Sequence, residues 1–452
     1  MGNSIFLTKD ISEIHNGFKD GQLDPLTLAE NIIDLYDLYQ NKFYPWVSFN
    51  KEILMKNALV SSKAIKNKDF FNLLEGIPFA VKDIINTYDF PTQMGSPLWK
   101  GFTPGNDARI VYNLKHRGAF VAGKTVTAEF AVHTLNETMN PHDITKTPGT
   151  SSSGSAVAIA LGMVPVALGT QTAGSIIRPA SFCGIYGCKP SFGLIPRTGM
   201  LKTTDTLDTV GFLTVHYKDI RRVFESIRVH GPNFPMSYNA FKDPERINKP
   251  KNRPWKIAIC KTHTWSNAYD YAKKSLIDFV DKLAKLPDIE VTNLDLPGEF
   301  NRSHDIHAVI YNKTLSYYFA EEFKKSELVS PIMNDLIIQG NKISPAYLQN
   351  AINEQRDLIY QMDKIFTEYD IIISLSTAGE APLRHKMEEP DPCLIWTMAH
   401  LPVISVPRFT SPSGLPFGLQ LVARKYSDYL LFNFLDYLYE NGFVPKSANK
   451  II

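Results

Sequence analysis

The chain has 452 residues, a net charge of +2, and 44% hydrophobic and 21% charged residues, which is typical of a globular protein with a sizeable core. Its lysines and arginines are scattered rather than striped, which argues against a nucleic-acid-binding surface. Four cysteines, none in a C-x-x-C pair, exclude a disulfide framework and favour a reducing cytoplasm. There is no run of about 20 apolar residues, so no membrane span is expected.

The order of predicted elements indicates the fold class. Apolar residues at helical spacing predict helices over residues 26–40, 50–66, 107–116, 156–161 and 268–286. Short apolar runs predict buried strands over residues 77–81, 119–122, 164–168, 255–260, 289–296, 371–375 and 403–406. Residues 230–254 are rich in Pro, Asn and Lys and are expected to form a surface excursion. Because strands and helices alternate, we expect an α/β protein with a largely buried sheet.

Lys82 stands at the end of the first predicted strand, within the segment G-I-P-F-A-V-K-D. Burial of an ammonium is costly and lowers the pKa of a lysine toward neutrality, where the amine is a usable base. The neighbouring Asp83 would oppose this shift, but adjacent side chains in a strand point to opposite faces. For a lysine considered alone, contact with solvent or pairing with a carboxylate is the more common outcome.

Two later segments are rich in small and hydroxyl-bearing residues. Residues 148–155 (P-G-T-S-S-S-G-S) lack the Gly-Lys-Ser/Thr ending of a Walker phosphate loop and directly precede core-like sequence. They predict a tight loop that presents hydroxyls and backbone N–H groups near a helix start. Residues 169–180 place small residues before Ser175, where consecutive N–H groups can form an oxyanion hole. An ordinary turn with a capping serine is the alternative for this second loop.

In this order, the lysine segment, the Ser/Gly-rich loop and the G-S-x-x-R-P sequence at Gly174–Pro179 resemble the amidase signature family. The similarity is strong over residues 74–213 and 371–430 and loose over 230–370. Within the two strongly similar ranges, the similarity includes residues 182–191, 207–211, 378–382, 396–397, 401–407 and 414–422.

The resemblance implies the amidase signature fold, an α/β architecture with a large mixed β-sheet flanked by helices on both faces. We expect one amidase domain over residues 1–452. Its expected parts are an N-terminal helical region (1–70), the signature core (74–213), a variable region (230–370) and the C-terminal part of the core (371–452).

The resemblance also implies a Ser-Ser-Lys triad that uses no metal and no other cofactor. Ser175 corresponds to the acylated nucleophile, Ser151 to the bridging serine on a cis peptide, and Lys82 to the base. The two serines are 24 positions apart, as in the family, which selects Ser151 over the adjacent serines. The implied oxyanion hole consists of the backbone N–H groups of Thr172, Ala173, Gly174 and Ser175.

The departures from the family pattern bear on the substrate. Thr150, Ser153 and Ala173 stand where glycine is common, and Gln171 replaces a common aspartate. Arg178 lies three residues after the nucleophile rather than two. This variant is most similar to the malonamidase-like branch, where the corresponding arginine binds a substrate carboxylate. The resemblance therefore implies that Arg178 and Thr150 contact substrate, while pairing of Arg178 with a protein acid is an equally good alternative.

The function expected from these residues is hydrolysis of a small amide through an acyl-enzyme on Ser175. One alternative is a component of a tRNA-dependent amidotransferase of the glutaminyl or asparaginyl type, against which Gln171, Arg178 and the lack of a basic surface argue. Esterase activity and a catalytically silent scaffold are further alternatives, the latter disfavoured by the intact triad. The expected partner is a small amide, with no nucleic acid or membrane, and the resemblance makes a homodimer plausible.

Two other pairs of residues are weaker candidates for chemistry. His304 and His307 have i, i+3 spacing, but the sequence offers no evident third ligand, so no metal site is expected. Cys183 and Cys188 lie near Ser175 in sequence and are expected to pack in the core.

Overall fold

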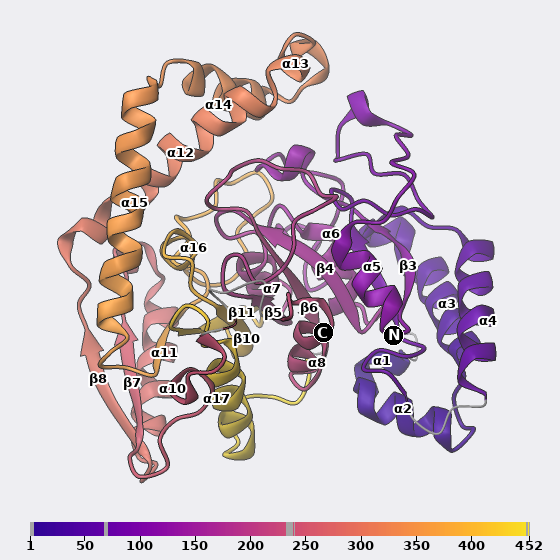
Figure 1. Cartoon of the computed structure of the whole chain (residues 1–452), viewed down its shortest axis with the longest axis horizontal. Helices are drawn as coiled ribbons and strands as arrows, with labels where there is room; N and C mark the ends of the chain where they lie inside the picture. The colour runs from indigo at the N-terminus through magenta and orange to yellow at the C-terminus, as the bar shows by residue number, and fades with distance from the viewer. Residues whose placement is uncertain (1–3, 67–70, 232–237, 239, 449–450, 452) are drawn as a thin grey trace.

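One mixed β-sheet runs through the protein and brings together strands from both halves of the sequence (Figure 1). The computed structural model describes residues 4–66, 71–231, 238, 240–448 and 451. Its 11 strands lie in the order β1-β3-β2-β4-β6-β5-β10-β11-β9-β7-β8. They are β1 (Trp46–Ser48), β2 (Pro78–Lys82), β3 (Phe120–Thr125), β4 (Val166–Gln171), β5 (Tyr186–Lys189), β6 (Thr209–Thr214), β7 (Trp255–Cys260), β8 (Ile289–Leu294), β9 (Ile371–Leu375), β10 (Val403–Thr410) and β11 (Pro416–Ala423).

The sheet is antiparallel in its middle and parallel on either side, except that the edge strand β1 pairs antiparallel with β3. The pairs β3–β2, β2–β4, β9–β7 and β7–β8 are parallel, whereas β4, β6, β5, β10, β11 and β9 pair antiparallel in turn. The six strands that come first along the chain occupy one half of the sheet, and the last five occupy the other. Pairing of β5 with β10 joins the two halves.

Helices surround this sheet. They are α1 (Ile5–Thr8), α2 (Ile11–Lys19), α3 (Pro25–Phe43), α4 (Lys51–Ile65), α5 (Arg109–His116), α6 (Ser153–Ala160), α7 (Ile177–Phe182), α8 (Asp219–Ile227), α10 (Pro244–Ile247), α11 (Asp270–Leu283), α12 (Ser303–Tyr318), α13 (Ala320–Phe323), α14 (Pro331–Asn341), α15 (Pro345–Ile365), α16 (Leu394–Met398) and α17 (Asp428–Glu440). Every residue of β2, β4 and β6 is buried, so both faces of the sheet are covered there.

Two short helices in the centre carry the serine-rich segments. α6 packs against β2, β3, β4 and β6, and all eight of its residues are buried, which the small side chains Gly154, Ser155 and Ala156 permit. α7 packs against β5, β10 and β11. The loops that precede these helices are therefore held against the middle of the sheet.

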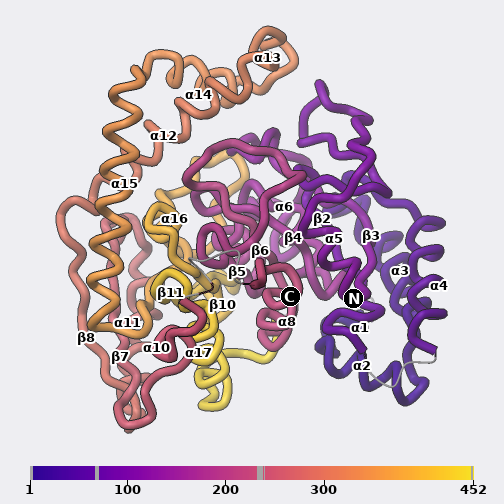
Figure 2. Tube along the Cα trace, in the orientation of Figure 1, coloured from indigo at the N-terminus to yellow at the C-terminus, as the bar shows by residue number. Residues whose placement is uncertain are grey.

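A group of helices projects beyond the sheet. α12 packs against both α14 and α15, and it also contacts α16. Figures 1 and 2 show α12, α14 and α15 extending past α16, with α13 at the far end. This projection belongs to the region that the sequence leaves only loosely similar to the family.

The predicted α/β class with a large mixed sheet is confirmed. Most predicted boundaries shift by a few residues; the strand expected over 164–168 runs from Val166 to Gln171, because Gln171 pairs with Thr209 of β6, and the helix expected over 156–161 begins at Ser153. β1, β5, β6 and β11 were not predicted. The surface stretch at 230–254 contains α10, while its residues 232–237 and 239 lie outside the described residues. None of the described helices combines the length and apolarity needed to cross a bilayer.

Candidate active site

Lys82 ends β2 as a completely buried side chain with three hydroxyl neighbours. Its Nζ lies 2.8 Å from Ser151 Oγ, 2.9 Å from Ser152 Oγ and 2.9 Å from Thr170 Oγ1. The residue is 0% exposed, and burial lowers its pKa well below the usual value, although the carboxylate of Asp208 opposes the shift. Asp83, the following residue, pairs with Lys124 instead, at 3.1 Å. The strand geometry therefore separates Lys82 from its acidic neighbour, as the sequence predicts.

The loop before α6 presents Ser151 to this lysine. The Thr150–Ser151 peptide is cis, as the family resemblance implies. Gly149 has a φ of +83°, and a Cβ there would lie 2.9 Å from Cα of Pro179, so only glycine fits this approach to α7. The carbonyl of Ser151 accepts from Ala128 N, which fixes the loop against the 126–132 segment.

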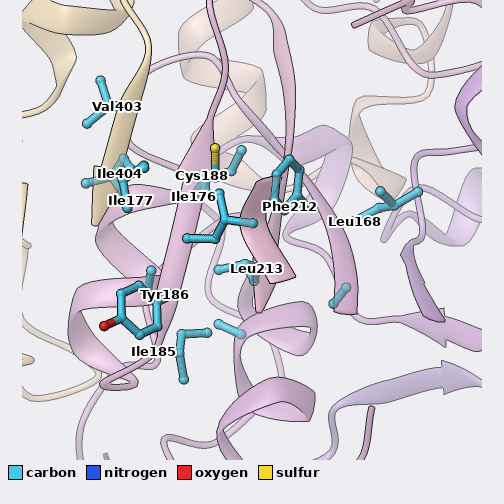
Figure 3. Packing of buried hydrophobic residues seen from close by; sticks show 14 of the residues in the cluster. Leu168, Ile176, Ile177, Ile185, Tyr186, Cys188, Phe212, Leu213, Val403 and Ile404 are labelled. Atoms are coloured by element: carbon cyan, nitrogen blue, oxygen red, sulfur yellow. The ribbon is translucent and has the colours of Figure 1, made fainter. Parts of the chain in front are cut away.

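Ser175 lies in the loop between β4 and α7. The next residue, Ile176, anchors the loop in the core near Cys188, Phe212 and Leu213 (Figure 3). The side chain of Ser175 is 5% exposed, and its hydroxyl makes no hydrogen bond with the described residues. Its oxygen is thus not committed to another protein group.

Gln171 fixes the shape of the loop that holds Ser175. Its Oε1 accepts from the backbone N–H groups of Ile176 (2.9 Å) and Ile177 (3.0 Å). Its Nε2 donates to Thr397 Oγ1 at 2.9 Å, and that hydroxyl donates to the carbonyl of Ala173 at 2.8 Å. A neutral amide therefore ties both ends of the loop together in the place where aspartate is common.

The predicted oxyanion donors have no competing acceptor in this part of the structure. Within the described ranges, the backbone N–H groups of Thr172, Ala173, Gly174 and Ser175 donate to no protein atom. A row of free N–H groups beside a serine hydroxyl is suited to the negative charge that develops on a carbonyl oxygen.

Two side chains hold the start of this row. Thr172 Oγ1 donates to Asp208 at 2.8 Å, and Asp208 also accepts from the backbone N–H groups of Thr203 and Thr204. His307 Nε2, from α12, donates to the carbonyl of Thr172 at 3.0 Å. Because Thr172 is bound from both sides, its N–H keeps a fixed direction.

A cavity of 820 Å³ opens beside the loop, between the α12–α14 projection and the segment 384–394. Ala173 and Thr150 are among the residues that line it. Its apolar wall consists of Leu135, Ala308, Tyr311, Ile332, Leu336 and Leu394. This volume suits a small organic substrate.

Arg178 lies in the cavity wall and has protein partners. Its NH1 contacts the carboxylates of Glu388 and, at 3.5 Å, Asp391, while its NH2 donates to the carbonyl of Thr150 at 3.1 Å. Burial alone would lower the pKa of Arg178, but Asp391 and Glu388 hold it above its usual value. Gln171 does not contact Arg178. Of the two roles left open by the sequence, this geometry favours pairing with protein acids.

Of the three residues of the predicted triad, the structure places Lys82 and Ser151 within 2.8 Å, while the described residues show no hydrogen bond between Ser151 and Ser175. The sequence missed Ser152 and Thr170 as partners of Lys82, the bridge made by Gln171, and the support from His307. Lys82, Ser152 and Thr170 come from three segments, so only their pairing in space reveals the contact. The sequence does contain a signal for Asp208, because this residue lies in the stretch 207–211 that resembles the amidase signature family.

The weaker candidates have structural surroundings. His304 shares a 2.7 Å hydrogen bond with His263, and no cluster of three or more His, Cys, Asp or Glu suited to a metal occurs among the described residues. Cys183 and Cys188 are buried, and burial raises the pKa of both thiols, so neither is a ready nucleophile.

A family model with the description Amidase matches residues 28–432. A component of the glutamyl-tRNA(Gln) amidotransferase of Clostridium acetobutylicum is 26% identical, over 94% of this chain and 97% of that protein. The corresponding component of the enzyme from Streptococcus thermophilus is 29% identical, over 94% and 95%.

Solved structures share the fold. A chain from an inhibitor-bound complex that bears on the origins of an s-triazine catabolic enzyme superposes with a TM-score of 0.86 at 23% identity, covering 97% of this chain and 100% of that one. The peptide amidase of Stenotrophomonas maltophilia gives 0.83 at 23% identity, with 99% of each chain covered. A glutamyl-tRNA(Gln) amidotransferase component from Thermotoga maritima gives 0.75 at 23%, covering 98% of this chain and 96% of that one.

Proposed function

The chain belongs to the amidase family, and we propose that it cleaves a small amide through an acyl-enzyme formed on Ser175. The observation that carries the proposal is the completely buried Lys82 with its Nζ 2.8 Å from Ser151 Oγ. Because burial lowers the pKa of Lys82 well below its usual value, the neutral amine that can act as a base forms at lower pH than in a solvent-exposed lysine. The free N–H groups of residues 172–175 supply the electrostatic stabilisation that acyl transfer needs.

In the proposed reaction, protons move along Ser175, Ser151 and Lys82. Neutral Lys82 takes the proton of Ser151 as Ser151 takes the proton of Ser175, and Ser175 Oγ bonds to the amide carbon. The carbonyl oxygen gains the negative charge and accepts hydrogen bonds from the loop. The proton then returns through Ser151 to the amide nitrogen, the C–N bond breaks, and ammonia or an amine leaves. Water releases the acid from Ser175 by the same steps in reverse order.

We propose that Thr150 and Arg178 define the end of the cavity that holds the substrate next to Ser175. Both residues line the cavity, and Arg178 binds the carbonyl of Thr150. Glu388 and the Thr150 carbonyl occupy NH1 and NH2 of Arg178, and its Nε, which is buried, is the guanidinium nitrogen without a partner among the described residues. This arrangement therefore does not favour carboxylate-bearing amides, which the malonamidase-like pattern implies as substrates.

A second candidate is the role of an amidotransferase component. In that reaction the released ammonia is passed to an acceptor molecule, whereas in simple hydrolysis it leaves into the solvent. The relatives described above carry this name, and their similarity supports this candidate at least as well as simple hydrolysis. The chemistry on Ser175 is the same in both cases. The difference is that an amidotransferase component needs protein partners and uses glutamine or asparagine as the ammonia donor. Esterase activity is a third candidate, because the same loop can bind the oxyanion of an ester.

The experiment has two parts. The purified chain is treated with a fluorophosphonate probe, and we expect labelling that Ser175→Ala abolishes; labelling lost in Ser151→Ala but kept in Ser175→Ala would reverse the assignment of the nucleophile. Ammonia release is then measured with neutral amides, glutamine and asparagine, and acid release with a simple aryl ester. Turnover of simple amides by the lone chain supports the hydrolase. Turnover restricted to glutamine or asparagine supports the amidotransferase.

A further inference from the structure

A second cavity, of 310 Å³, shares no residue with the cavity beside the Ser175 loop. Its wall is formed by α10, the second half of α15, Ala399, Leu401 and the turn that follows β11, and Figure 1 shows α10 next to the end of α15. The two cavities meet opposite ends of α16, since Leu394 at its start lines the first and Ala399, just after its end, lines the second. A cavity of this size accommodates a small organic ligand.

Positive charge dominates the wall of this second cavity. Arg246, Arg356 and Lys425 line it, together with one acid, Asp363. The acid is already engaged, because Asp363 accepts from Nε and NH2 of Arg424 at 2.6 and 2.8 Å. With their ion partners, the wall residues comprise four cations (Arg246, Arg356, Arg424 and Lys425) and two acids (Asp243 and Asp363). The wall therefore holds two positive charges in excess when Lys425 is protonated.

Two of these cations have no acid of their own. Among the described residues, neither Arg356 nor Lys425 has a carboxylate within ion-pair distance. Lys425 Nζ instead lies 3.3 Å from His400 Nδ1. His400 is neutral, because its Nε2 donates to the carbonyl of Thr206 at 2.7 Å and burial lowers its pKa to about 3. The imidazole therefore accepts a hydrogen bond from Lys425 without compensating its charge.

An uncompensated ammonium in this position is unfavourable. Burial lowers the pKa of Lys425, which means that the surroundings disfavour its charged form. A bound anion offsets this effect, and a guanidinium presents two parallel N–H groups to phosphate or carboxylate oxygens. Arg356 is exposed and makes no hydrogen bond with the described residues, so it can adopt the rotamer that a ligand needs.

The rest of the wall includes apolar and aromatic side chains. Tyr360, Tyr426 and Leu401 line it beside the cations. We propose that this cavity binds a small organic phosphate monoester, with the phosphate on Arg356 and Lys425 and the hydrocarbon body against the two tyrosine rings. A phosphate monoester carries nearly two negative charges at neutral pH, which matches the excess positive charge better than a single carboxylate does.

The test is isothermal titration calorimetry on the whole chain with phenyl phosphate, inorganic phosphate, benzoate and phenol. At about 150 mM salt, where distant surface charges are screened, we expect phenyl phosphate to bind at least about ten times more tightly than each of the others. Lys425→Gln and Arg356→Gln should each weaken its binding by about 10-fold or more, as for loss of a hydrogen bond to a charged group. Lys282→Gln is the matched control, because Lys282 of α11 is an exposed lysine outside the cavity wall, and this variant should bind phenyl phosphate as the wild type does.

Absence of phenyl phosphate binding, equal weakening by Lys282→Gln, or wild-type binding in both Lys425→Gln and Arg356→Gln would overturn the assignment. Benzoate that binds as tightly as phenyl phosphate would replace the phosphate by a carboxylate, and inorganic phosphate that binds as tightly would remove the role of the tyrosines; either result refutes the proposed class of ligand. If Lys425→Gln does not fold, Arg356→Gln decides, since the exposed Arg356 has no partner to lose among the described residues. The measurement requires no turnover, so its failure leaves the proposed function of Ser175 untouched.

Discussion

Replacement of Gln171 by leucine removes the bridge that shapes the Ser175 loop while nearly preserving side-chain volume. Gln171 is completely buried, and three hydrogen bonds connect it to Ile176, Ile177 and Thr397. In Gln171→Leu, the backbone N–H groups of Ile176 and Ile177 lose their acceptor. The hydroxyl of Thr397 still donates to Ala173, so the other end of the loop keeps one contact.

The size of the effect follows from these two N–H groups. Leaving a buried donor without a partner costs about 1–3 kcal/mol, so the pair costs roughly 2–6 kcal/mol if the loop does not move. This is a large part of the roughly 5–15 kcal/mol that stabilises a typical folded protein. The loop is therefore expected to shift until both groups find acceptors. Such a shift displaces the oxyanion donors at residues 172–175, and loss of even one donor costs about 10²- to 10³-fold in rate.

The assay is the rate of Ser175 labelling by a fluorophosphonate, which requires the oxyanion donors and no knowledge of the natural substrate. Gln420→Leu is the matched control, because Gln420 is also completely buried and donates two hydrogen bonds, to Ser374 and Leu375, in a different part of the sheet. We expect both variants to lose stability in urea, and only Gln171→Leu to lose labelling by about 100-fold or more. A folded Gln171→Leu protein that labels at the wild-type rate would refute the role of this bridge.

Three further predictions test the base, a buried acid and the core. Lys82→Met should reduce amide turnover by about 10²- to 10⁴-fold; wild-type turnover should fall as pH drops through the lowered pKa of Lys82, and persistence of activity in the variant would remove the lysine from the mechanism. Burial raises the pKa of Asp219 from 3.8 to about 8, so the folded state holds a proton that the unfolded chain releases in this range, and stability falls as pH rises. Urea unfolding of Asp219→Asn between pH 5 and 8 should lack this fall, which is at most about 1.4 kcal/mol per pH unit; parallel curves for variant and wild type would contradict the assignment. In Gly211→Ala, the new Cβ overlaps the carbonyl of Cys188 and lies 2.6 Å from Ile176 Cδ1, so its urea midpoint should drop sharply while that of Gly298→Ala, where nothing lies within 4 Å, stays near wild type.

The strands that the sequence predicts are continuous apolar runs, such as residues 255–260 and 371–375, which match β7 and β9. The missed strands have weaker patterns. β5 (Y-G-C-K) and β6 (T-V-G-F-L-T) contain glycines, which are depleted in strands. The structure explains these glycines, because a Cβ on Gly187 would lie 2.6 Å from Ala180 Cβ and a Cβ on Gly211 would lie 2.6 Å from Ile176 Cδ1. A requirement of packing between distant segments thus hides the strand signal.

For the site, local sequence indicates which loops matter but not which charges meet. Lys82 and the loop of residues 172–175 stand out because their composition is unusual for core elements. The partners of Arg178 do not, because Glu388 and Asp391 are more than 200 positions away in a segment without helix or strand. Pairing over such a separation depends on the whole sheet, since β10 brings the second half of the chain against β5.

The contact between β5 and β10 also bears on how the protein is assembled. Strands β1 to β6 are complete by residue 214, and the chain up to that point includes Lys82, Ser151 and Ser175, whereas Asp391, Thr397 and the α12 helix come from the later half. During synthesis, the first six strands can pair with one another before the last five leave the ribosome, and the edge of β5 stays open until β10 arrives. A polypeptide divided after α8 would have the proposed nucleophile and base in one fragment and most of the cavity wall in the other. We therefore expect activity to return only when the two fragments are mixed.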